Sequence, residues 1–174
     1  MTAPIVVLDI DGVLADVRHR LHHVTARPKN WAAFFAAAAD DEVLAVGAEF
    51  AHHAASTHVV VYLTGRPERL RAATQSWLDQ HELPPGRLLM RAEGDQRPSA
   101  VVKVSELRRL RRTSTVALLV DDDLTVVEAA RAAGFTVVHA TWMPRTIEGR
   151  HSRADDVLFG VDVLHAAQEL DGRT

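Results

Sequence analysis

The sequence contains no cysteine, and this absence removes several classes of site at once. Disulfide bonds, thiolate metal sites and a cysteine nucleophile are all excluded. Lysine is almost absent too: Lys29 and Lys103 are the only two, and every other basic residue apart from histidine is arginine. No segment approaches the ~20 consecutive apolar residues that a membrane-spanning helix requires. The first residues also lack a basic region followed by a long apolar run, so we expect no signal peptide.

The composition lacks an excess of either charge. Among 174 residues the net charge is −3 and the charged fraction is 25%, which gives no general indication of nucleic-acid binding or of a disordered acidic tail. The hydrophobic fraction of 47% is enough for one domain with a substantial core. We therefore expect a single soluble, cytoplasmic domain over residues 1–174, with no membrane contact and no evident obligate protein partner.

Short, continuously apolar runs alternate with helix-like segments along the chain. Continuous apolar runs are typical of parallel strands that are covered on both faces. The alternation predicts an α/β fold, with a doubly wound, Rossmann-like parallel sheet of about five strands. The expected strands span 4–10, 58–64, 87–91, 114–120 and 135–140, and the expected helices span 30–39, 42–55, 67–81, 98–112, 124–134 and 157–170, with an irregular segment at 144–156.

Polar residues stand where three of these strands end. Ligands collect at the carboxyl ends of strands in an open parallel sheet, so these residues are expected to meet in one crevice. Alternate residues of an extended strand share a side, so Asp9 and Asp11 are able to reach the same group. The tips comprise Asp9 and Asp11 after the first strand, Thr64, Gly65 and Arg66 after the second, and Asp121, Asp122 and Asp123 after the fourth.

This many carboxylates repel one another unless a cation lies between them. Oxygen ligands without cysteine or a clear histidine set favour Mg²⁺ over Zn²⁺. Such a metal suits a phosphate dianion as substrate, with one carboxylate as nucleophile and the other as proton shuttle. The alternative for each aspartate is a turn former or helix cap, and for three separate strand tips that requires three coincidences.

The same residues resemble a known family in an ordered set of motifs. "VVLDIDGVL", "VVVYLTGR", Lys103 and "LLVDDD" look like the four motifs of the haloacid-dehalogenase-like (HAD) phosphohydrolases, over about residues 4–140, which leaves 141–174 as a C-terminal extension. The resemblance implies that Asp9 is the nucleophile and that Asp11 is the acid/base, with its backbone carbonyl on Mg²⁺. It also implies that Thr64 and Lys103 bind phosphoryl oxygens.

By the same resemblance Asp122, with Asp121 as a further candidate, completes the metal site. Val126 stands where many members carry another aspartate, so the division of labour among the three adjacent aspartates stays open. "TGRPE", "MRAEGDQRPSAVVK" and "VDDDLTVVEAARAAGF" are similar to the 3′-phosphatase domain of phage-type polynucleotide kinase/phosphatases. The chain between the first two motifs is short, which implies a minimal or absent cap and an open site.

Several other side chains are candidates for substrate contact. Arg66 and Arg97 each stand near a motif and are the stronger candidates for holding a phosphodiester backbone. The alternative for Arg69, Arg71 and Arg91 is a solvated helix face. The aromatic residues Trp31, Phe34 and Phe35 could stack a base, although core packing is the alternative at helical spacing. The histidines His19, His22 and His23 are expected to cover the crevice mouth or face water.

The sequence thus predicts a Mg²⁺-dependent phosphomonoesterase that works through an aspartyl-phosphate, with a polynucleotide 3′-phosphate or a nucleotide as substrate. A sugar or metabolite phosphatase is the alternative among enzymes. A binding module that kept the fold and lost the chemistry is the alternative among non-enzymes.

Overall fold

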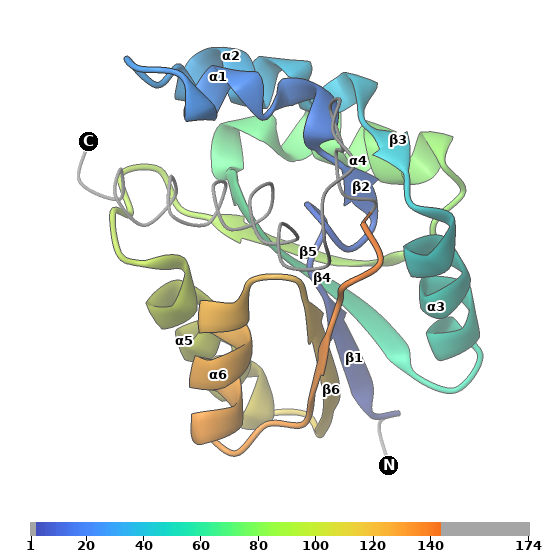
Figure 1. Ribbon diagram of the computed structural model, residues 1–174. Coiled ribbons are helices and arrows are strands. Elements are labelled where there is room, and N and C mark those ends of the chain that lie inside the picture. The colour runs from blue at the N-terminus through green and yellow to red at the C-terminus, as the bar shows by residue number, and fades with distance from the viewer. Residues whose placement is uncertain (1–2, 144–174) are drawn as a thin grey trace, which may run out of the picture.

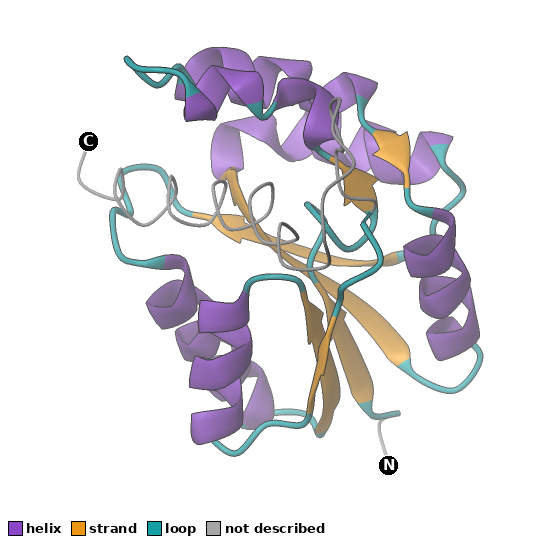
Figure 2. Ribbon diagram, viewed as in Figure 1, coloured by secondary structure: helices purple, strands orange, loops and turns teal. Residues whose placement is uncertain are grey.

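A five-stranded parallel sheet forms the centre of the computed structural model, which describes residues 3–143. The strand order is β5-β4-β1-β6-β7, and Figure 2 shows helices on both faces of the sheet. The expected α/β class and parallel topology are confirmed. The strands are β1 (Ile5–Leu8), β4 (Val59–Pro67), β5 (Gly86–Arg91), β6 (Val116–Asp121) and β7 (Val137–His139).

Successive residues of β1 point to two separate hydrophobic cores, which is why this strand is apolar without interruption. Val6 and Leu8 pack in the core that includes α3 (Ala45–Ala55) and α4 (Arg71–Gln80). Ile5 and Val7 pack in the core that includes α5 (Ser99–Arg111) and α6 (Leu124–Ala132). The strand order reverses between β1 and β6, so the switch point of the sheet lies beside the end of β1.

A small insert lies beyond the carboxyl ends of the strands, at the top of Figure 1. It has its own cluster of buried side chains, centred on Val17, Val24 and Phe34. An antiparallel pair of two-residue strands ties the insert to the end of the first motif, where Ala15 faces Val43. Its elements are β2 (Ala15–Asp16), η1 (Arg18–Arg20), α1 (His22–Thr25), α2 (Trp31–Ala36), η2 (Ala37–Asp40) and β3 (Glu42–Val43).

The predicted helix boundaries differ from the structure in two places. The helix expected over 30–39 ends at Ala36 and continues as the 3₁₀ turn η2, and residues 42–43 form β3 because they pair with β2. The helix expected from residue 67 begins instead with the 3₁₀ turn η3 (Glu68–Leu70), because Pro67 still has the extended backbone of β4 (φ −69°, ψ 151°). The elements expected at 144–156 and 157–170 lie outside the described residues. No helix within residues 3–143 has the length and apolar character needed to span a bilayer.

Candidate active site

Three carboxylates meet at the switch point of the sheet. Asp9 directly follows β1, whereas Asp121 ends β6 and Asp122 comes next. Each offers one oxygen, and these three oxygens lie within 4.8 Å of one another. All three side chains are buried. A compact set of carboxylate oxygens suits a hard cation such as Mg²⁺, so the residues present fit the ion that the sequence predicts.

Lys103 is the basic side chain that contacts this cluster of carboxylates. The side chain extends from α5, and its Nζ lies 2.6 Å from Asp9 Oδ2 and 2.7 Å from Asp121 Oδ2. Burial by itself would lower the pKa of Lys103, but the two carboxylates outweigh it and raise the pKa above its usual value. The ammonium therefore stays charged, and it is placed where a phosphoryl oxygen next to Asp9 would meet it.

Burial also shifts the carboxyl groups of Asp9 and Asp121 toward their protonated forms. It raises the pKa of Asp121 to about 6, although Lys103 acts in the opposite direction. The pKa of Asp9 is raised for the same reason, and Asp121 and Asp122 add repulsion to it. Desolvation together with like charges makes this cluster costly to ionise without a further cation. The electrostatics of the site therefore agree with its geometry in favouring a bound metal ion.

Gly12 leaves the space that Asp122 uses. Its backbone is left-handed, with φ of +79°, and a Cβ at this position would lie 1.9 Å from Asp122 Oδ2. Only glycine combines this backbone conformation with such a close approach. The Gly that follows the paired aspartates of the first motif thus has a defined steric role, which is to let Asp122 reach the cluster.

The third of the adjacent aspartates has a structural task. Asp123 is the N-cap of α6, where its Oδ1 accepts hydrogen bonds from the backbone of Thr125 (2.8 Å) and Val126 (3.4 Å). A capping carboxylate of this kind stabilises the helix start. This separates the roles that the sequence left open, because Asp121 and Asp122 lie in the cluster and Asp123 holds the helix.

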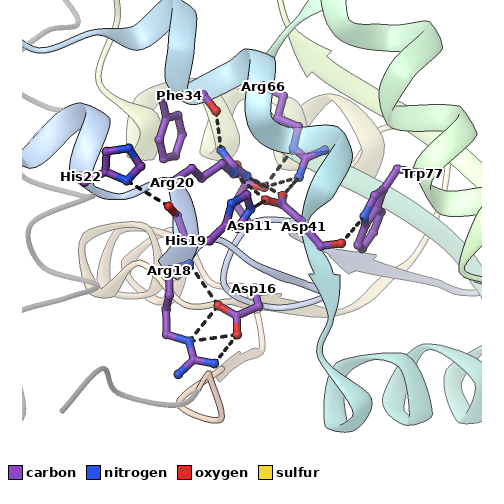
Figure 3. A network of polar contacts seen from close by, with 10 residues as sticks. All are labelled: Asp11, Asp16, Arg18, His19, Arg20, His22, Phe34, Asp41, Arg66 and Trp77. Carbon is purple, nitrogen blue, oxygen red and sulfur yellow. Dashed lines mark hydrogen bonds and ion pairs between the residues drawn. The ribbon is translucent and has the colours of Figure 1, made fainter. Parts of the chain in front are cut away.

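Asp11 is oriented by two arginines (Figure 3). Its Oδ1 lies 2.9 Å from Arg20 Nη2 and 2.6 Å from Arg66 Nη2. Burial by itself would raise the pKa of Asp11, but the two guanidinium groups outweigh it and lower the pKa to about 2. Asp11 is therefore a carboxylate at neutral pH, which is the form that accepts a proton.

Asp41, from the insert, joins the same two arginines, and the sequence analysis missed it. Its Oδ1 lies 2.6 Å from Arg20 Nε, and its Oδ2 lies 2.7 Å from Arg66 Nη2. The backbone carbonyl of Asp41 also accepts a hydrogen bond of 2.8 Å from Trp77 Nε1 of α4. Burial raises the pKa of Asp41, and the guanidinium groups offset this only in part. The sequence signal at residues 40–41 was a helix break, which does not predict a buried ion pair.

The remaining predicted residues lie at different distances from this centre. Thr64 is buried two residues beyond Tyr62, whose partner in the sheet is Leu8, so it stands level with Ile10 at the same edge. Its Oγ1 accepts a hydrogen bond of 3.2 Å from the backbone of Arg66, across Gly65.

Arg97 lies in the loop after β5, where its side chain is 55% exposed and pairs with Asp95 at 2.6 Å. None of the contacts found among residues 3–143 brings Arg97 to the carboxylate cluster. Arg97 therefore stays a prediction for substrate contact, whereas Arg66 belongs to the buried centre.

Residues outside the insert hold the loop that carries the paired aspartates. The backbone N–H of Leu44 donates to Leu14 O at 2.7 Å, and Trp142 Nε1 donates to Val13 O at 2.9 Å. Gly47 in α3 packs so closely that a Cβ there would lie 1.9 Å from Val13 O. The loop after β1 is thus fixed from three directions, which keeps Asp9 and Asp11 in place.

Comparison with known proteins agrees with this geometry. The chain matches the model of the polynucleotide kinase PNKP phosphatase domain over residues 3–141. No curated protein matches the chain in sequence. A chain in the structure of the Pnkp1/Rnl/Hen1 RNA repair complex is 25% identical with a TM-score of 0.66, and the match covers 79% of this chain and 42% of that one. This chain therefore spans less than half the length of that relative.

More distant structures share the fold alone. A putative phosphoglycolate phosphatase from Lactobacillus plantarum is 15% identical with a TM-score of 0.55, and the match covers 91% of this chain and 99% of that one. The putative HAD-hydrolase YfnB from Bacillus subtilis, bound to magnesium, is 10% identical with a TM-score of 0.55, and the match covers 91% and 98%. Because the PNKP phosphatase model spans nearly all of the described residues, the chain belongs to the polynucleotide kinase PNKP phosphatase domain family of HAD-like phosphatases.

Proposed function

We propose that this protein is a Mg²⁺-dependent phosphomonoester hydrolase that forms an aspartyl-phosphate on Asp9 and acts on a polynucleotide 3′-phosphate or a nucleotide. The observation that carries the proposal is the convergence of Asp9, Asp121 and Asp122 on one buried point, with Lys103 beside them. A structural ion pair alone would not need three buried carboxylates at the switch point of a parallel sheet.

The proposed reaction begins with attack by a carboxylate oxygen of Asp9 on phosphorus. A P–O bond to Asp9 forms, the ester P–O bond breaks, and the leaving oxygen takes up a proton. Water then attacks the same phosphorus, loses a proton to a base, and displaces Asp9 with release of inorganic phosphate. A magnesium ion held by Asp9, Asp121 and Asp122 would supply charge neutralisation for the phosphoryl group.

Within this reaction the two partners of Asp9 have distinct tasks. Lys103 contacts Asp9 directly, so it can bind a phosphoryl oxygen during both steps. Asp11 is ionised in this geometry, which favours the second step, where a carboxylate removes a proton from water. A proton-donating role in the first step would require substrate to weaken the contacts of Asp11 with Arg20 and Arg66.

The substrate class rests on the family. The matching model describes a polynucleotide kinase phosphatase domain, and the relative at 25% identity is found in an RNA repair complex. The likeness to a putative phosphoglycolate phosphatase lies at 15% identity and supports only the fold, so it does not favour a metabolite substrate. The intact set of Asp9, Lys103, Asp121 and Asp122 argues against a catalytically silent module.

Activity on three substrates tests the proposal. We expect Mg²⁺-dependent hydrolysis of p-nitrophenyl phosphate and of an oligonucleotide with a 3′-phosphate, with weaker hydrolysis of a sugar phosphate. In the Asp9→Asn variant the turnover should fall by far more than tenfold, because the nucleophile is lost. Asp123→Asn is the matched control, since this neighbouring carboxylate caps α6. Activity within about tenfold of wild type in Asp9→Asn would refute the assigned nucleophile.

A further inference from the structure

The insert carries a segment from which acidic residues are absent. Residues 17–39 contain four Arg or Lys residues and three histidines but no Asp or Glu, although the whole chain has a net charge of −3. This segment forms η1, α1 and α2, which lie across the carboxyl ends of the strands (Figure 1). Two of these cations are neutralised at the site, because Arg20 pairs with Asp11 and Asp41 and Arg18 pairs with Asp16. A segment without acidic residues beside the site does not repel a polyanion whose end enters it.

Two aromatic rings of α2 are stacked at the edge of this segment. The ring centroids of Trp31 and Phe35 are 5.8 Å apart with an interplanar angle of 30°, and both residues are half-buried. Phe34, between them in sequence, is fully buried and meets each ring edge-on, at 5.5 and 5.4 Å. The core-packing alternative therefore holds for Phe34, and the buried ring fixes the other two at the edge of the hydrophobic cluster.

Arg69, from η3, adds a cation to the same place. Its guanidinium carbon lies 6.0 Å from the centroid of the Phe35 ring. The side chain is 53% exposed, and its partner Glu93 is 54% exposed. A surface ion pair of this kind contributes little to stability, so Arg69 is able to exchange Glu93 for a phosphate at small cost.

Arg20 links the aromatic cluster of α2 to the catalytic centre. The guanidinium of Arg20 lies 4.1 Å over the ring of Phe34 and also binds Asp11 at 2.9 Å, as Figure 3 shows. On the other side, Arg66 binds Asp11 and stands three residues before Arg69. A strand whose terminal phosphate lies at Asp9 would therefore pass this surface with the nucleotides next to that phosphate.

We propose that Trp31, Phe35 and Arg69 form a binding surface for the nucleotides that precede the 3′-phosphate of a single-stranded polynucleotide. The inference rests on the proposed function and adds the path that the polynucleotide substrate takes across the protein surface. Base–aromatic stacking together with cations that track the backbone is how proteins bind single strands. A duplex hides its base faces, and an acidic peptide has no flat faces to stack, so the rings favour a single strand.

Kinetics with substrates of two lengths test the surface. The measured quantity is the ratio of kcat/KM for a 3′-phosphorylated single-stranded decanucleotide to kcat/KM for a nucleoside 3′-monophosphate. We expect Phe35→Leu and Arg69→Gln each to lower this ratio about fivefold or more, the loss expected for one stacked base or one phosphate contact. Arg109→Gln is the control, because this exposed arginine lies in the last turn of α5 and pairs with Glu106 of the same helix. It should leave the ratio unchanged.

Binding without turnover gives an independent measurement. In the Asp9→Asn protein, titration with the decanucleotide should quench tryptophan fluorescence, and Trp31→Phe in the same background should remove that change while keeping a ring for stacking. Arg69→Gln should also reduce the slope of log K against log[salt] by about 0.7, the value for one phosphate contact to a single strand. An exposed arginine tolerates this change, so a folding defect does not obscure the result.

The outcomes separate the two proposals. If wild type hydrolyses p-nitrophenyl phosphate but no 3′-phosphorylated oligonucleotide, both the polynucleotide substrate and the surface are wrong. If it hydrolyses the oligonucleotide and the ratio stays within twofold of wild type in Phe35→Leu and Arg69→Gln, the surface alone is wrong. Tighter binding of a blunt duplex, or of a polyglutamate peptide, than of the single strand would also overturn the assignment.

Discussion

The replacement of Gly12 by alanine is the sharpest test of the metal site. The backbone at Gly12 has φ of +79°, and an added Cβ would lie 1.9 Å from Asp122 Oδ2. The left-handed conformation costs an alanine about 1–2 kcal/mol. Contacts under 3.0 Å are essentially never seen for real Cβ atoms, so the loop and Asp122 have to separate by more than 1 Å. A misplacement of this size at a catalytic group costs on the order of 100-fold in rate.

Gly134 provides a matched control for the backbone strain. It has the same φ of +79°, but a Cβ there would meet nothing within 4 Å. Both alanine variants should therefore lose about 1–2 kcal/mol in urea unfolding. Only Gly12→Ala should also lose about 100-fold in kcat/KM for p-nitrophenyl phosphate and require more Mg²⁺ for half-maximal rate. If the two variants have the same kcat/KM and the same Mg²⁺ requirement, the close approach of Gly12 and Asp122 does not serve the site.

Two further predictions follow from the buried charges. Stabilisation by Mg²⁺, measured as the rise in Tm, should be larger at pH 7.5 than at pH 5, because burial raises the pKa of Asp121 to about 6 and protons compete with the ion below that value. Without Mg²⁺ the same raised pKa makes Asp121 favour the folded state as the pH falls. An equal rise in Tm at both pH values would contradict the assignment of Asp121 to the metal site. Asp41→Asn should cost about 3–5 kcal/mol in urea unfolding, because it leaves Arg20 and Arg66 with an uncompensated buried charge. The exposed Asp79→Asn serves as the control and should change stability by no more than about 0.5 kcal/mol.

The sequence by itself determined the sheet and the elements that carry the cluster. Uninterrupted apolar runs indicated strands covered on both faces, and Ile5 to Leu8 indeed divide between two cores. The ends of those runs placed Asp9, Asp121 and Asp122 at one edge, since parallel strands share their carboxyl ends. These features depend on contiguous residues and on one topological rule, so they can be predicted from the sequence alone.

Other features were decided only by the tertiary structure, because each joins residues far apart in the chain. Asp41 meets Arg66 across 25 positions, and no local pattern marks it as the partner of a buried arginine. Gly12 and Gly47 are required by the close approach of Asp122 and of Val13 O, which come from other elements. Side-chain roles also depended on this packing. Asp121 and Asp122 enter the cluster, whereas Asp123 is already the N-cap of α6 and accepts hydrogen bonds from the start of that helix.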